Sequence, residues 1–138
     1  FNVAEGLNRG WAVSTGATTG SAEDWYQRGI QASLAFYGLK DGDNTVTFSR
    51  DGGISNFVNH TVNFMFAQFY AQPLVKYAGN NADGLRQILE QKYVAFFQNS
   101  GMEAWYNQRR TGTPTFLTGV GTGNSGRIPK RWLYPQAE

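Results

Sequence analysis

The stretch of residues 84–112 constrains the fold most, because it carries the most regular helical pattern in the sequence. Its apolar side chains recur at steps of three and four residues, which marks one apolar helix face: Leu85, Ile88, Leu89, Tyr93, Phe96 and Phe97. Gln87 falls between them on the wetter side. Residues 99–101 tolerate the left-handed backbone that ends a helix. Helical spacing restarts at Met102, so the pattern predicts a helix, a break and a second, shorter helix.

The second helix has a clear end in the sequence. Arg109 and Arg110 are cations, which suit the negative end of a helix dipole. Pro114 follows closely and cannot easily continue the helix. Upstream, residues 1–11 keep helical spacing up to Gly10, which predicts the end of another helix.

Residues 21–37 predict a further helix. Ser21 is followed three residues later by Asp24, the pattern of a capped start, and Gly38 is a stop. Apolar side chains fall on two faces of this segment: Trp25, Gly29, Ala32 and Phe36 on one, and Tyr26, Ile30, Leu34 and Tyr37 on the other. A helix that is apolar on two sides is usually packed between neighbours. The predicted fold is therefore mostly α, a layered helical array with long irregular loops.

The middle of the chain leaves alternatives open. Turn residues bracket residues 45–48, which predicts a short strand or an extended loop. Residues 54–72 have apolar side chains at helical spacing, whereas Val62, Phe64 and Phe66 alternate as in a strand. Length favours the helix, which Pro73 would end.

No motif in the sequence indicates catalytic or metal chemistry. Oxygen-bearing side chains near residue 43 alternate as in an EF-hand, but the twelfth position is Gly52 instead of glutamate. His60 is the only histidine and has no partner at useful spacing, which favours a structural role. Residues 59–61 fit a glycosylation sequon, but we discount it within a predicted helix. The glycine-rich loop at residues 118–126 lacks the Lys-Ser/Thr of a phosphate-binding loop.

Charge and cysteine content exclude several classes of function. The net charge of +2 is too small to argue for nucleic-acid binding. Residues 109–138 carry +4 and residues 1–108 carry −2, so the basic end could meet phosphate or an acidic partner. Arginines that tie loops to helix ends are the more usual explanation. The chain has no cysteine, hence no disulfide and no thiolate metal site.

The sequence gives no signal of membrane insertion or of complete ends. No run approaches the roughly 20 apolar residues of a membrane helix, and no signal peptide is present. The chain begins at Phe1 within helical spacing and stops at Glu138 without a closing element. We therefore expect a piece of a longer protein, truncated at both ends.

Three stretches resemble the C-terminal signature of the SusD/RagB family of nutrient-binding proteins. They are residues 88–93, 103–114 and 127–138. The specific parts are Arg-Arg-Thr-Gly-x-Pro and Ile-Pro-x-Arg at this spacing, preceded by a tryptophan: Trp105, Arg109, Arg110, Thr111, Gly112, Pro114, Ile128, Pro129 and Arg131. Tyr93 departs from the pattern, because that branch of the family often has tryptophan there. Residues 4–11 and 26–33 resemble the helical repeats that precede the signature.

The resemblance implies a fold, a location and a partner. The fold would be mostly α, built on tetratricopeptide-like helix pairs, with residues 1–138 forming the C-terminal portion of a single SusD-like domain. The protein would be an outer-membrane lipoprotein of Bacteroidetes, on the extracellular face, with its lipid anchor outside this fragment. Such proteins are lids on SusC-like, TonB-dependent β-barrel transporters. They capture glycans or oligopeptides, are not enzymes and need no cofactor or metal.

The signature residues themselves predict structural roles. Arg109 and Arg110 could fix the loop at residues 119–126 by donating to its carbonyls, since forked donors suit irregular backbone. Trp105 could pack under residues 128–129. The resemblance transfers no ligand-contacting residue to this part of the chain.

Trp132 and Tyr134 are the candidates for ligand contact. An extended segment exposes alternate side chains, and aromatic faces stack on sugar rings while hydroxyls form hydrogen bonds. A place in the core or in an interface is the more usual role for such residues.

Two rival functions remain. A glycosidase needs paired carboxylates, but the nearest candidates, Glu90 and Glu103, lie on separate predicted helices without a supporting pattern. A helical scaffold that binds only protein is the alternative to nutrient capture. It would have no affinity for oligosaccharide or oligopeptide.

Overall fold

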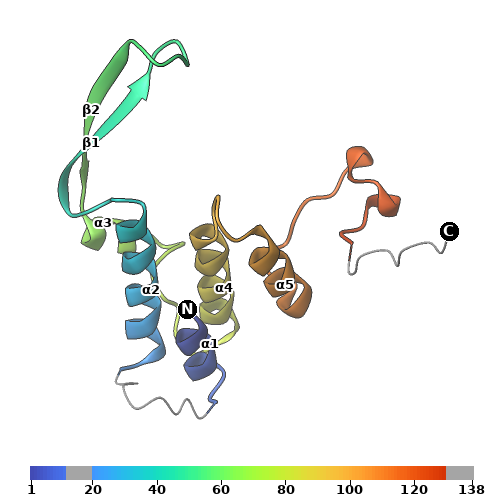
Figure 1. Cartoon of the computed structure of the whole chain (residues 1–138). Coiled ribbons are helices and arrows are strands. Elements are labelled where there is room, and N and C mark those ends of the chain that lie inside the picture. The colour runs from blue at the N-terminus through green and yellow to red at the C-terminus, as the bar shows by residue number, and fades with distance from the viewer. Residues whose placement is uncertain (12–19, 130–138) are drawn as a thin grey trace. The chain divides into compact units, whose positions relative to one another are not determined.

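The computed structural model describes residues 1–11 and 20–129 (Figure 1). Its elements are α1 (Asn2–Asn8), α2 (Ala22–Phe36), β1 (Gly42–Ser49), β2 (Phe57–Phe64), α3 (Phe66–Tyr70), α4 (Ala82–Ala95), α5 (Gly101–Thr111) and the 3₁₀ helices η1 (Val120–Thr122) and η2 (Asn124–Gly126). The predicted mostly α class is confirmed, whereas tetratricopeptide-like layering stays a prediction. Within the described ranges, no helix has both the length and the apolarity to span a bilayer.

The chain divides into two compact units, Phe1–Ala95 and Phe96–Glu138. In the first unit, the core lies where α1, α2 and α4 pack together. Its buried side chains come from all three helices and from the loop before α4: Ala4, Tyr26, Ile30, Val75 and Ile88. The Tyr26 hydroxyl donates to the Val75 carbonyl at 2.8 Å, and burial raises the pKa of this tyrosine. The loop is therefore fastened to α2 from inside the core.

The helix α2 begins and ends as its sequence predicts. Ser21 Oγ accepts from the Asp24 N–H at 3.2 Å, and Asp24 Oδ2 accepts from the Ser21 N–H at 2.7 Å. The Ser21 N–H and then the Ser21 hydroxyl, which also donates to Asp24 Oδ2 at 2.8 Å, lower the pKa of the Asp24 carboxyl. Gly38 follows the helix with φ of 77°, a conformation that favours glycine. The face with Tyr26 and Ile30 supplies the fully buried side chains. On the other apolar face Trp25 is partly buried against the core, whereas Phe36 is 71% exposed.

The predicted helix, break and helix over residues 84–112 are confirmed as α4 and α5. The expected wet position of Gln87 is wrong, since this residue is only 5% exposed. Its Oε1 accepts from the Ala78 N–H and its Nε2 donates to the Lys76 carbonyl, both at 2.9 Å. A buried amide is stable when both of its ends are paired, and periodicity alone does not reveal such partners.

A strand replaces the middle of the helix predicted for residues 54–72. β2 pairs with β1 in antiparallel register, from Gly42 opposite Phe64 to Ser49 opposite Phe57, and only the short α3 follows. Valine, threonine, asparagine and phenylalanine dominate this segment and are modest helix formers, whereas β-branched and aromatic residues suit strands. The open choice at residues 45–48 is likewise a strand. The sequon at residues 59–61 thus lies on a strand, so a helix is no reason to discount it.

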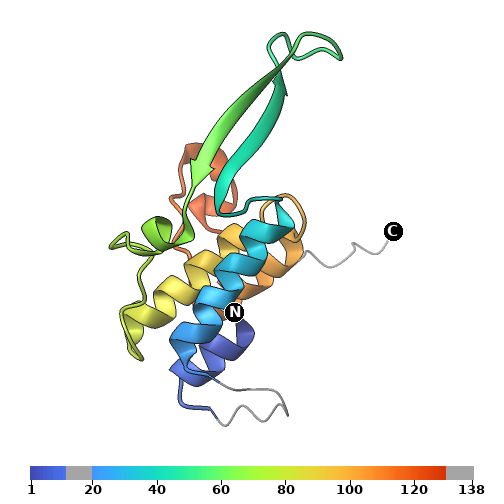
Figure 2. The ribbon, with the colours of Figure 1, turned by 90° about the vertical axis from the view of Figure 1, so that its left-hand side faces the viewer.

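The hairpin of β1 and β2 projects from the helices of the first unit (Figure 2). The two strands make their main contacts with each other. This arrangement leaves both strand edges without a further strand in the described structure.

Replacing Gly84 by alanine should destabilise the first unit. An added Cβ would meet the Gly79 carbonyl oxygen and the Tyr77 ring. We expect a loss of about 1–3 kcal/mol in the free energy of unfolding from overpacking, although alanine favours helices by about 1 kcal/mol. Urea unfolding measures this. The control is Gly101→Ala in α5, where no atom lies within 4 Å of the added Cβ; equal stability of both variants would contradict the close packing.

Candidate functional site

The stretch of the signature with Arg-Arg-Thr-Gly-x-Pro lies on α5 and on the segment that follows it, in the second unit, whereas residues 88–93 lie on α4 in the first unit. The helix ends at Gly112, whose φ of 75° places it in the left-handed region. Thr111 Oγ1 donates to the Asn107 carbonyl at 2.7 Å and accepts from the Thr113 N–H at 3.1 Å. The Thr-Gly part of the signature therefore caps the C-terminus of α5. The peptide bond between Thr113 and Pro114 is cis.

Trp105 on α5 contacts several other residues of the second unit. Its Nε1 donates to the Pro129 carbonyl at 3.0 Å, which links α5 to the end of the described chain. The Arg109 guanidinium carbon lies 4.7 Å from the centroid of the Trp105 ring, a cation–π contact. The Tyr106 ring lies 5.1 Å from the Trp105 ring at 53°. We call Trp105, Tyr106, Arg109 and Pro129 the Trp105 cluster.

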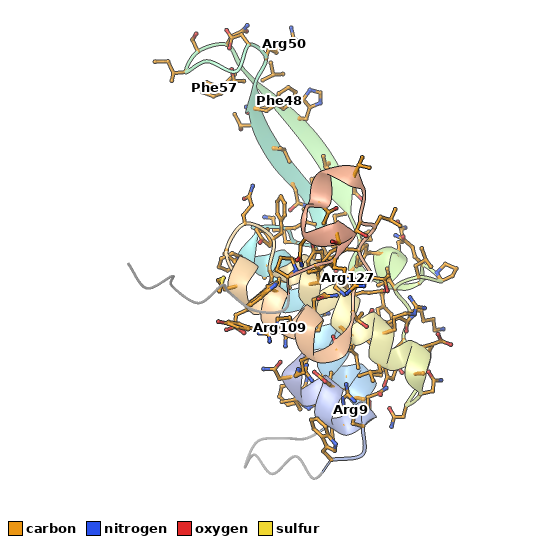
Figure 3. All side chains as sticks on the ribbon, turned by 90° about the vertical axis from the view of Figure 1, so that its right-hand side faces the viewer. Arg9, Phe48, Arg50, Phe57, Arg109 and Arg127 are labelled. Carbon is orange, nitrogen blue, oxygen red and sulfur yellow. The ribbon has the colours of Figure 1, made fainter. Side chains whose placement is uncertain are left out.

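The two arginines of the signature have different partners. Arg109 stacks on Trp105, whereas Arg110 Nη2 donates to Asn107 Oδ1 at 2.9 Å. Asn107 is buried, so this contact lies against the most protected side chain of α5. That the arginines also hold the carbonyls of residues 119–126 stays a prediction. Figure 3 shows Arg109 on α5 and Arg127 on the segment after η2.

The segment between Gly112 and Pro129 has little packing of its own. It holds two 3₁₀ turns, η1 and η2, and Gly123 between them has φ of 65°. Leu117 and Val120 are fully exposed apolar side chains. The Trp105–Pro129 hydrogen bond ties the end of this segment to α5.

The residues chosen from the sequence are only partly placed by the structure. Trp132, Tyr134 and Arg131 lie outside the described residues. Tyr106, which the sequence marks only by helical spacing, is 47% exposed and contributes an aromatic face and a hydroxyl. The sequence could have indicated Tyr106 as a candidate, because it directly follows Trp105 and so lies on a different side of the same helix.

The chemistry of the Trp105 cluster is that of binding. Aromatic faces, a phenol and a guanidinium can stack on and hydrogen-bond to a sugar or a peptide. Over the described ranges, no group of three or more His, Asp or Glu side chains is placed to hold a metal ion. Of the two carboxylates considered for hydrolysis, Glu90 receives both Nη1 hydrogen bonds of Arg86, at 3.1 and 3.0 Å.

A comparison with protein families gives one match. The family model SusD-like_2, described as starch-binding associating with outer membrane, matches residues 1–135. Searches of curated proteins and of solved structures found no match.

Trp105→Phe should loosen the end of the described chain, since phenylalanine keeps an aromatic ring but cannot donate to Pro129. Loss of a hydrogen bond of about 1 kcal/mol raises the population of an open state about fivefold. Tryptic cleavage after Arg127 should accelerate by that factor, while cleavage after Arg50 in the first unit serves as the internal reference. Tyr106→Phe is the matched control and should leave the rate unchanged. An unaltered rate in the tryptophan variant would show that the bond does not restrain this segment.

Proposed function

The chain belongs to the SusD-like family of starch-binding proteins that associate with the outer membrane, and from this premise we propose that it captures nutrient at the cell surface. It would be the lid component of a SusC/SusD-like, TonB-dependent uptake complex. The match over residues 1–135 carries the proposal, because it spans almost the whole chain. The family description favours a glycan as the nutrient, with an oligopeptide as the second choice.

The proposal includes the architecture of the whole protein. Residues 1–138 would form the C-terminal portion of a single SusD-like domain, as the position of the signature in the family suggests. The packing of α1, α2 and α4 on one another supports a tetratricopeptide-like helix array. The lipid anchor would lie outside this part of the protein, and the domain would face the exterior of the outer membrane of a Bacteroidetes cell.

Binding without catalysis fits the chemistry of the described side chains. The Glu90 carboxylate is engaged by Arg86, which also lies 3.6 Å from Asp83. A glycosidase needs one carboxyl group free to give its proton and a second near it. Glu90 lies in the first unit and Glu103 in the second.

A helical scaffold that binds only protein is the second candidate. The observation that favours it is the number of exposed apolar side chains outside the core, such as Leu74, Leu117 and Val120. Large exposed apolar groups often mark protein contacts. A scaffold and a nutrient-binding lid differ in their affinity for small ligands.

Copurification tests the uptake complex. The full-length protein, extracted gently in detergent from its native outer membrane, should bring a TonB-dependent β-barrel in stoichiometric amount, identified by mass spectrometry. The control is a lipoprotein of another family from the same membrane, which should bring none. Recovery of the protein free of any barrel would exclude the lid role and leave the scaffold.

Ligand capture is tested by calorimetric titration of the full-length protein with malto-oligosaccharides and with a set of oligopeptides. We expect binding of the oligosaccharide. Trp132→Ala or Tyr134→Ala should weaken it about tenfold if their rings stack on sugar, since about 1.4 kcal/mol of stacking would be lost. Phe36→Ala is the control, because this exposed residue should not alter affinity. Absence of binding to both ligand classes would favour the scaffold.

A further inference from the structure

We draw no further inference here: the strongest candidate, the buried indole N–H of Trp25 on α2, which has no hydrogen-bond acceptor among the described residues, carries nothing, because nothing in the structure shows which group covers it.

Discussion

A polar clamp around the loop before α4 is the interaction on which the first unit depends. The Tyr26 hydroxyl holds the Val75 carbonyl, and Gln87 holds Lys76 and Ala78 through both ends of its amide. Asn8 adds bonds to the Tyr77 hydroxyl at 2.6 Å and to the Gly79 carbonyl at 3.2 Å. One loop is thus tied to α2, α4 and α1 in turn. Each of these hydrogen bonds contributes about 1 kcal/mol net to stability. Removal of one partner leaves the other buried group unpaired, which costs about 1–3 kcal/mol. The hydrogen bonds of the clamp therefore stabilise the loop together.

The clamp also explains why the apolar core can be small. Few side chains are fully buried, and the aromatic rings around Tyr26 fill the space between the helices, with Tyr77 and Tyr70 at 5.7 and 6.3 Å between centroids. Burial raises the pKa of Tyr70 to about 12, and its hydrogen bond to Glu23 adds to this effect. Burial also raises the pKa of Tyr26, so Tyr26 and Tyr70 both keep their protons at physiological pH.

The second unit has a different physical basis. Among its described residues only Asn107 is buried, and the Trp105 cluster holds the chain by a hydrogen bond and a cation–π contact. Surfaces with so few buried groups open easily. Exposed apolar side chains lie in both units, on the hairpin and on residues 112–129. Stable helices in the first unit and open surfaces around them suit a protein that binds other molecules.

The sequence by itself determined α2, α4 and α5, because caps, stops and apolar periodicity are local: Ser21 with Asp24, Gly38 and Gly112 mark boundaries that the structure keeps. It also determined the family, since the signature on α5 is a fixed spacing of residues along the chain. Only the tertiary structure decided that residues 57–64 form a strand, because β2 exists through its pairing with β1. The same is true of the burial of Gln87 and of the hydrogen bond from Trp105 to the Pro129 carbonyl, where the sequence predicted only packing. Each depends on partners at a distance in the sequence, and a periodic pattern within one segment carries no information about them.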